Sequence, residues 1–365
     1  MKILQIIDNQ NSGGAEKQFR EVIKFLSKKD IELYLYFPCW NKNKKIPDEL
    51  RVVVKDIYIF NKSNSLDIFR IICKLNKLIK IIKPNIVHSW LYYSNLINIL
   101  SNHNHHKKII SQRFDYKTCI EGNIYSFWRK QIIKFIDKKT DFLVVNSSEN
   151  YNYLISKFKY LQNKIYYIPN GIKIIEDFIK KDYEIKNNEV KLLHIGNFTV
   201  EKNHLFFLPF IKKLRKICKF KLTLIGDGAL RDKFLNKIKQ EELSDYIDYK
   251  GKIGKVYKIL KYYDIFVYPS ISEGMPNALM EALGYGLPSI SYSVGGCKDL
   301  IKNGINGFLV DINNLDDFFQ LTQQLIENKD LREKLGKNAT DFIKNNFSID
   351  RIVSQYFDLY LNLLK

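Results

Sequence analysis

The chain has 365 residues, of which 45% are hydrophobic and 27% are charged. This composition is typical of a globular protein with room for two domains, and it excludes a disordered chain. No stretch approaches the roughly 20 apolar residues that span a bilayer, and the apolar start at residues 1–8 is too short for a secretory signal. The five cysteines are scattered without C-x-x-C spacing, which indicates free thiols. We therefore expect a cytoplasmic protein.

The formal net charge of +20 is distributed unevenly along the chain. Residues 1–167 hold 29 Lys and Arg against 14 Asp and Glu, whereas residues 168–365 hold 30 against 25. A coding bias towards lysine would affect both halves alike, so it does not explain the asymmetry. Because a basic surface attracts anionic partners, we expect the N-terminal half to meet an acidic membrane surface, a phosphorylated acceptor or nucleic acid.

Strands and helices are predicted to alternate through the first half of the chain. Residues 2–7 are predicted as a strand, and residues 15–28 as a helix with apolar side chains at helical spacing. The further predicted strands are 31–37, 52–57, 86–88, 109–111 and 142–146, with a long amphipathic helix at 66–82. Buried strands separated by helices indicate a parallel, doubly wound sheet.

The alternation stops at Ile168-Pro169-Asn170-Gly171, and a polar stretch follows. A second series of predicted strands lies at 190–195, 220–225, 246–249, 265–268 and 288–292, followed by helices at 315–327, 331–345 and 349–364. The predicted fold class is α/β, with two doubly wound, Rossmann-like domains facing each other across a cleft. The expected segments are a first domain at 1–168, a linker at 169–189, a second domain at 190–345, and a C-terminal helix at 346–365 that packs back toward the first domain.

Two glutamates lie near the predicted start of a helix in the second domain. The strand 265–268 ends at Pro269, a loop carries Glu273, and Pro276 is expected in the first helical turn, with Glu281 just over one turn further on. Free backbone amides at such a helix start bind anions, and carboxylates bind sugar hydroxyls. Together these features suggest a nucleotide-sugar site. A solvated or ion-paired Glu281 is the alternative.

Glycine-rich turns follow the first strand of each predicted domain. Gly13 and Gly14 would let the backbone approach a phosphate, although a simple turn has the same pattern. After residues 190–195, the turn carries Gly196 and Lys202, which would point a cation at a diphosphate or, alternatively, into solvent.

Two other patterns argue against a cofactor or metal site. Gly226-Asp227-Gly228 lacks the full dinucleotide fingerprint, so no nicotinamide or flavin cofactor is expected. The histidine-rich tract 103–108 lacks acidic or cysteine partners and is more typical of a solvated loop than of a metal site.

Taken together, the chain resembles glycosyltransferase family 4, the retaining, nucleotide-sugar-dependent enzymes with the two-domain GT-B fold. The residues that carry the resemblance occur in family order: Gly13-Gly14, Ile168-Pro169-Asn170-Gly171, Gly196, Lys202-Asn203, Leu224-Ile225-Gly226-Asp227-Gly228, Glu273, Glu281, Gly284-Tyr285-Gly286-Leu287-Pro288, Gly295-Gly296 and the stretch 303–310. They extend over nearly the whole chain, and the ordered set is specific although each part is weak alone.

The resemblance implies a role for each matching residue of the donor site. Glu281 would bind the donor ribose, Glu273 would contact the transferred sugar, and Lys202 would neutralise the leaving diphosphate. The Gly13-Gly14 loop would close over that diphosphate from the acceptor-side N-terminal domain. The other expected donor-binding residues are Gly196, Asn197, Lys252, Ile253, Gly274, Met275, Pro276, Asn277 and Leu279.

The resemblance also implies a mechanism without a metal ion, and retention by attack on the same face of the sugar. Glu273 is then expected to position the substrate, and the two-carboxylate logic of glycosidases does not apply.

The chain departs from the family pattern at three places in the expected site. The family usually has Arg where this chain has Asn197, and Arg113 is a candidate to replace that charge. A histidine common on a loop of the N-terminal domain is missing, and His88 is the candidate substitute. A hydrogen-bonded histidine at a strand end is an equal alternative for His88. Asp299 stands where Glu is more usual.

We therefore expect a retaining glycosyltransferase that moves a sugar, with UDP-sugars favoured as donors, to a polyprenyl-diphosphate-linked or other glycan acceptor in bacterial surface-glycan assembly. The segment 127–139 alternates apolar and basic residues, which fits either an interfacial helix on the inner face of the cytoplasmic membrane or a core-facing helix. A GT-B epimerase or phosphorylase is the alternative within the enzymes. A nucleic-acid-binding protein is the alternative outside them, and it lacks any recognition motif.

Overall fold

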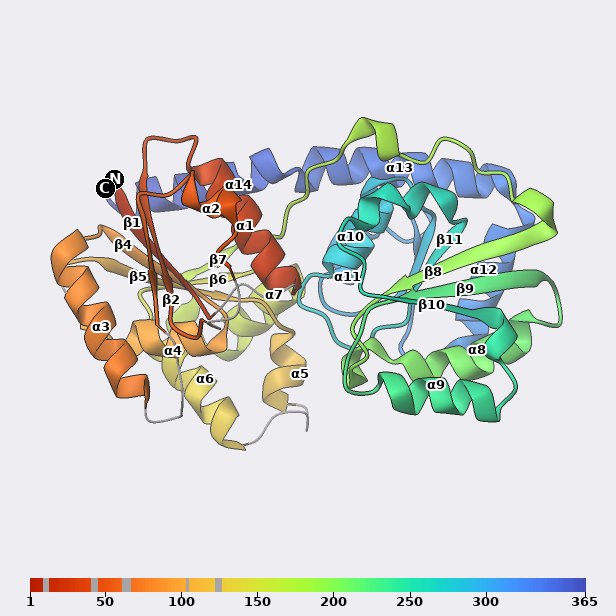
Figure 1. Cartoon of the computed structure of the whole chain (residues 1–365), viewed down its shortest axis with the longest axis horizontal. Coiled ribbons are helices and arrows are strands. Elements are labelled where there is room, and N and C mark those ends of the chain that lie inside the picture. Colours follow the sequence, from red (N-terminus) through yellow and green to blue (C-terminus); the bar gives the residue numbers. More distant parts are fainter. Residues whose placement is uncertain (9–12, 41–44, 61–66, 103–104, 122–126) are drawn as a thin grey trace. The chain divides into compact units, whose positions relative to one another are not determined.

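The computed structural model describes residues 1–8, 13–40, 45–60, 67–102, 105–121 and 127–365. The chain divides into two compact units: unit 1 comprises Met1–Gly171 and Ile349–Lys365, and unit 2 comprises Ile172–Ser348. Each unit contains one parallel sheet with helices packed on its faces (Figure 1). The prediction of two doubly wound α/β domains is confirmed. Residues 11–12, next to the first glycine turn, and residues 103–104 of the histidine tract lie outside the described residues.

Unit 1 has a seven-stranded sheet in the order β3-β2-β1-β4-β5-β6-β7. Its strands are β1 Lys2–Ile7, β2 Glu32–Phe37, β3 Asp56–Ile59, β4 Ile86–Trp90, β5 Lys107–Gln112, β6 Phe142–Val145 and β7 Ile165–Tyr167. Its helices are α1 Gly14–Leu26, α2 Asp48–Arg51, α3 Asp67–Ile82, α4 Tyr92–Leu100, α5 Tyr116–Glu121, α6 Phe127–Lys139, α7 Ser148–Lys157 and α14 Ile349–Asn362.

Both faces of this sheet are covered, which explains why its strands are apolar in consecutive positions. Alternate side chains of β1 point to opposite faces: Ile3 and Ile7 join the cluster under α1 and α14, whereas Leu4 and Ile6 join the cluster under α3. The C-terminal helix α14 is thus a packed component of unit 1.

Some predicted boundaries in unit 1 are wrong. The strand expected at 52–57 begins at Asp56, because Pro47 and the acidic Asp48 and Glu49 start the helical turn α2. Val52, the C-cap that follows this turn, is 82% exposed despite its apolar character. Strand β7 was not predicted, because three residues are too few to show a periodicity.

Unit 2 has a six-stranded parallel sheet in the order β10-β9-β8-β11-β12-β13. Its strands are β8 Glu189–Ile195, β9 Lys219–Ile225, β10 Ile247–Gly251, β11 Ile265–Tyr268, β12 Ser289–Tyr292 and β13 Phe308–Val310. Its helices are α8 Phe207–Leu214, α9 Arg231–Gln240, α10 Asn277–Gly284, α11 Cys297–Leu300, α12 Leu315–Glu327 and α13 Lys329–Phe347. The strand order reverses between β8 and β11, and ligands of such sheets bind at the carboxyl ends of the strands at this reversal.

Of the expected linker 169–189, residues 169–171 are counted with unit 1 and residues 172–189 with unit 2. Specific hydrogen bonds attach them: the Tyr183 hydroxyl donates to the Gly286 carbonyl over 3.0 Å, and the buried Arg332 guanidinium donates to the Tyr183 carbonyl over 2.7 and 3.1 Å. The backbone amide of Ile172 also donates to the Phe347 carbonyl. Within the described ranges, none of the helices has both the length and the apolar character to cross a membrane.

Helix α14 is attached to the sheet of unit 1 through His88. The imidazole is fully buried, with Nδ1 2.6 Å from the Tyr360 hydroxyl and Nε2 2.8 Å from Ser111 Oγ. The Gln5 side-chain amide donates to the same Tyr360 hydroxyl, which leaves the tyrosine proton for His88 Nδ1. Burial lowers the pKa of His88 well below its ordinary value, so the ring is neutral.

Removing the Tyr360 hydroxyl should therefore destabilise unit 1. In Tyr360→Phe, His88 Nδ1 and the Gln5 amide both lose a partner in a buried place, so we expect the free energy of unfolding to fall by about 1–3 kcal/mol. Urea unfolding measures the change. The control is Tyr262→Phe, because Tyr262 is 63% exposed. Equal stability of the two variants would contradict this role for Tyr360.

Candidate active site

A lysine, a tyrosine and a glutamate meet at the strand-order reversal of unit 2. Lys202 lies in the short turn after β8, Tyr268 is the last residue of β11, and Glu273 lies in the loop that follows β11. Lys202 Nζ donates to the Tyr268 hydroxyl over 2.7 Å, and this hydroxyl donates to Glu273 Oε1 over 2.7 Å. Lys202 is also ion-paired with the same carboxylate oxygen. The three side chains thus form a closed ring of hydrogen bonds.

A glycine fixes the loop that carries Glu273. Gly295 has φ +45°, and a Cβ at this position would lie 1.7 Å from the carbonyl oxygen of Glu273. The next residue, Gly296, donates its amide to the Gly274 carbonyl over 2.8 Å. Only glycine permits both the left-handed backbone and this close approach. The glycine pair therefore holds the Glu273 loop against the turn after β12.

The turn after β8 is held in a similar way by its neighbour after β9. Gly226 has φ +146°, and a Cβ there would lie 2.0 Å from the Gly196 carbonyl oxygen. Gly196 itself lies under the aliphatic chain of Lys202, while Asn197 is exposed. The Asn203 side-chain amide joins this turn to the loop after β11 by donating to the Pro269 carbonyl over 3.3 Å.

Glu281 lies on α10, and it is only 8% exposed. The structure therefore contradicts the alternative that Glu281 is a solvent-exposed helix residue. Pro276 is the N-cap of α10, with ψ 106°, so the helix begins one residue later than predicted, at Asn277. Met275 and Leu279 are buried beside it in the core of unit 2. The chain thus runs from Glu273 in the loop directly into α10, which carries Glu281.

Two histidines that the sequence analysis did not single out lie beneath Lys202. His204 is 5% exposed and stacks on Phe198, with ring centroids 3.9 Å apart. His194 is fully buried, and its Nδ1 bonds the Val267 carbonyl at 3.0 Å. Burial, and then the Lys202 charge, lowers the pKa of His204 to about 3; burial lowers that of His194 well below its ordinary value. Both rings are neutral, so they add no positive charge next to Lys202.

The other predicted site residues of unit 2 lie at the edge of its sheet. Lys252 and Ile253 follow β10; the lysine is exposed, and the isoleucine packs against the core. Their direct backbone neighbour Gly251 accepts a hydrogen bond from the Gly226 amide. The two residues are thus linked through one backbone contact to the turn that supports Gly196.

The remaining predicted site residues belong to unit 1. Gly13 is the N-cap of α1 and Gly14 its first residue. The Arg113 guanidinium lies 4.2 Å from the centroid of the Trp90 ring, and it donates to the Asn170 side chain and to the Tyr356 hydroxyl. His88, with both ring nitrogens bonded and no exposed surface, makes the contacts of a structural histidine.

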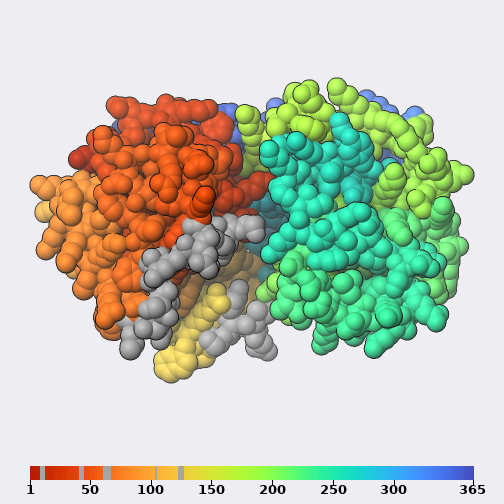
Figure 2. All heavy atoms as spheres, in the orientation of Figure 1, coloured from red at the N-terminus to blue at the C-terminus, as the bar shows by residue number. Residues whose placement is uncertain are grey.

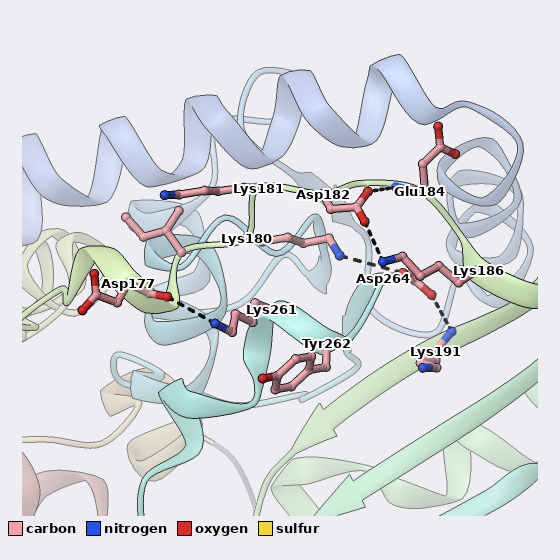
Figure 3. A pocket seen from close by; sticks show the side chains of 11 residues that line it. Asp177, Lys180, Lys181, Asp182, Glu184, Lys186, Lys191, Lys261, Tyr262 and Asp264 are labelled. Carbon is pink, nitrogen blue, oxygen red and sulfur yellow. Dashed lines mark hydrogen bonds and ion pairs between the residues drawn. The ribbon is translucent and has the colours of Figure 1, made fainter.

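A cavity of about 350 Å³ lies elsewhere in unit 2 (Figure 3). Its lining includes Lys180 and Asp264, whose side chains are 3.8 Å apart, and Lys261, which donates to the Asp177 carbonyl. Asp264 immediately precedes β11, so this cavity is at the amino end of the strands, opposite to the edge where ligands of such sheets bind. Over the described ranges, no group of three or more His, Cys, Asp and Glu side chains could hold a metal ion.

The buried His204 should make stability depend on pH. The unfolded chain binds a proton on this residue below its ordinary pKa of 6.5, and the folded chain does not until about pH 3, so this residue lowers stability as pH falls below 6.5. In His204→Phe, the loss of unfolding free energy between pH 7 and pH 5 should be smaller than in the wild type by about 2 kcal/mol. Urea unfolding at both pH values measures this. His105→Asn is the control, since His105 is exposed; an unchanged pH dependence in His204→Phe would contradict the prediction.

Two known families match the chain, one in each half. The family described as Glycosyltransferase Family 4 matches residues 12–175, and the family described as Glycosyl transferases group 1 matches residues 175–342. An α-1,4-N-acetyl-D-galactosaminyltransferase of Campylobacter jejuni, which acts on a diphospho-undecaprenol-linked glycan according to its name, is 26% identical, and the alignment covers 98% of each chain. 

Two other relatives match over a shorter length. The UDP-Gal:alpha-D-GlcNAc-diphosphoundecaprenol alpha-1,3-galactosyltransferase of Escherichia coli is 31% identical over 52% of this chain and 49% of its own. The N-acetyl-alpha-D-glucosaminyl L-malate synthase of Bacillus anthracis is 29% identical over 51% of this chain and 49% of its own. The chain thus matches about half the length of these two relatives.

Solved structures share the fold. Anabaena HepE in complex with UDP and glucose superposes with a TM-score of 0.83 at 14% identity, covering 99% of this chain and 100% of its own. TarM superposes with a TM-score of 0.83 at 16% identity, covering 98% of each chain. The two units therefore have the GT-B architecture. Because the two family matches together extend over residues 12–342, the chain belongs to glycosyltransferase family 4, and it is a glycosyltransferase.

Proposed function

We propose that this enzyme is a retaining glycosyltransferase that moves a sugar from a nucleotide sugar, with UDP-sugars favoured, to a lipid-linked glycan in bacterial polysaccharide, lipopolysaccharide or glycoprotein-glycan assembly. The observation that carries the proposal is the Lys202–Tyr268–Glu273 ring at the strand-order reversal of unit 2. It combines a cation for a leaving diphosphate with a carboxylate for sugar hydroxyls at the edge where such sheets bind ligands.

The choice of donor is supported by two names among the similar proteins. The E. coli relative is named for UDP-Gal, and the Anabaena structure contains UDP and glucose. In this proposal Glu281 binds the ribose hydroxyls, and the backbone of Gly274 to Asn277 holds the sugar and phosphate. Lys202 supplies positive charge to the departing diphosphate, and no metal ion is needed for that step.

Retention would follow from attack on the same face of the sugar. The acceptor oxygen forms the new bond to the anomeric carbon as the bond to the diphosphate oxygen breaks, and the acceptor proton passes to the departing diphosphate. Glu273 Oε1 is already bonded by a cation and by a phenol. Those bonds stabilise the carboxylate charge and make it a weak nucleophile, so we assign Glu273 to positioning the sugar.

The proposed acceptor is a polyprenyl-diphosphate-linked glycan presented at a membrane. The C. jejuni and E. coli relatives carry such acceptors in their names, and residues 1–167 hold 29 basic against 14 acidic residues. The positive charge suits the diphosphate of such a lipid and the anionic membrane around it.

Helix α6 is the part of unit 1 that we propose contacts the membrane. Ile133 and Ile136 are buried in the core, so one face of the helix has the core-facing role. Its first residues Phe127 and Trp128 are 66% and 74% exposed, and Phe135 is 43% exposed. The segment around α6, in yellow, lies at the surface of unit 1 (Figure 2). Exposed aromatic residues next to lysines are typical of interfacial helices, which supports a peripheral location on the inner face of the cytoplasmic membrane.

Donor binding can be tested by thermal stabilisation with a panel of UDP-, GDP- and ADP-sugars. A ligand at 100 times its dissociation constant should stabilise the protein by about 2.7 kcal/mol. Glu281→Ala should abolish the stabilisation, because the carboxylate that binds the ribose is lost. Glu333→Ala is the control, since Glu333 is paired with Lys337 on the exposed face of α13. A full shift in Glu281→Ala would refute the ribose role.

The same donor, incubated with a lipid-linked glycan, distinguishes the enzyme classes. Transfer should yield a longer glycan with the α-configuration of the donor and release a nucleoside diphosphate, which NMR and mass spectrometry detect. An epimerised nucleotide sugar would instead support an epimerase, and a sugar phosphate formed when inorganic phosphate is added would support a phosphorylase.

Membrane binding can be tested by co-sedimentation with liposomes that contain anionic lipids, at low and high salt. The wild type should bind at low salt and be released at high salt. Replacing Phe127 and Trp128 by alanine should reduce binding at least several-fold, whereas Phe69→Ala on α3, where Phe69 is 71% exposed, should not. No binding of the wild type, or equal binding of all three proteins, would refute the proposed surface.

A further inference from the structure

Tyr268 lies between the two charged groups of the site. Its hydroxyl accepts a hydrogen bond from Lys202 Nζ and donates one to Glu273 Oε1, both over 2.7 Å. The ring is 1% exposed, and it packs beside Phe266 with ring centroids 5.6 Å apart. Such packing holds the hydroxyl in one place. A phenol can accept from a cation and donate to a carboxylate at the same time, and a phenylalanine could do neither.

The Lys202 ammonium would have to bond both its present partners and the diphosphate of the donor. In this structure it is bonded to Tyr268 and Glu273. In the proposed reaction it also has to approach the oxygens of a diphosphate, and its two present bonds leave only one of its three N–H donors for them. If Lys202 turns to the diphosphate, Glu273, which is 9% exposed, loses the cation that balances its charge. A buried carboxylate without a partner is strongly destabilised.

We propose that Tyr268 is a positioning residue, whose hydroxyl holds Glu273 in its place against the sugar while Lys202 moves from the carboxylate to the diphosphate of the donor. The inference rests on the proposed function and adds a residue that the family resemblance did not supply. It requires only an exchange of hydrogen bonds.

The tyrosine hydroxyl is suited to remain a donor throughout this exchange. Burial, and then the charge of Glu273, raises the pKa of Tyr268 well above its ordinary value. The phenol therefore keeps its proton at neutral pH, and it can donate to Glu273 whether or not Lys202 is bonded to the same carboxylate.

The test is Tyr268→Phe in the full chain, with the nucleotide sugar that the panel identifies. We expect kcat to fall about 10-fold or more while KM for the donor stays within about threefold, because the hydroxyl matters most after Lys202 has left Glu273. The matched control is Tyr183→Phe, which removes another buried hydroxyl of unit 2, bonded to the Gly286 carbonyl. Its kcat should stay within about twofold of the wild type. A kcat of Tyr268→Phe within twofold of the wild type would overturn the proposal.

A double-mutant cycle separates positioning from a general loss of structure. If Tyr268 acts through Glu273, then Tyr268→Phe should change kcat by less than about twofold when it is added to Glu273→Gln. Effects that multiply independently would overturn the proposal. Thermal stabilisation by UDP, measured on each variant, reports whether the donor site is folded. A wild type that transfers from none of the nucleotide sugars would instead refute the proposed function, which distinguishes that failure from failure of the Tyr268 role.

Discussion

The ion pair between Lys202 and Glu273 is the interaction on which the arrangement of the site depends. Its two charges come from the turns after β8 and β11, which are paired side by side in the sheet although the residues are 71 positions apart. Removing two charges from water is costly, and a pair of this kind is stable only if further hydrogen bonds satisfy both partners. Tyr268 provides one bond to each. A cation and a carboxylate are therefore held ready at the edge of the sheet where a ligand binds.

The backbone around the pair has little freedom to relax. Gly295 lies against the Glu273 carbonyl, and Gly226 lies against the Gly196 carbonyl, so each charged side chain belongs to a loop that is fixed by a neighbouring turn. The rings of His194 and His204 form the floor below Lys202, and both are neutral. The geometry thus connects the glycines of the sequence to the proposed chemistry.

The sequence predicted most of the sheet elements, and the exceptions have physical reasons. Residues 265–268 are four apolar residues between Asp264 and Pro269, and the strand was predicted with its correct ends. Strands β7 and β13 have three residues each, which is too short for a periodic pattern. Residues 52–54 look like a strand, but they follow a helical turn that only the capping residues before it indicate.

The site was predicted less completely than the fold. Lys202 and Glu273 lie in recognisable sequence motifs, so both could be predicted as site residues. Their roles toward the substrate stay predictions. The part played by Tyr268 could not be found in this way, because its hydroxyl meets Lys202 only through the pairing of β8 with β11. His204 is a similar case: its contact with Phe198 depends on the left-handed residue Asn203 that redirects the chain. Long-range pairing, more than local propensity, determines these contacts.

The most direct test of the account is a crystal structure of the enzyme with a nucleoside diphosphate bound. We expect Lys202 Nζ to lie within about 3 Å of a diphosphate oxygen, the Tyr268 hydroxyl still to donate to Glu273, and the ribose to be bonded to Glu281. A diphosphate bound away from Lys202, with the Lys202–Glu273 pair unchanged, would contradict it.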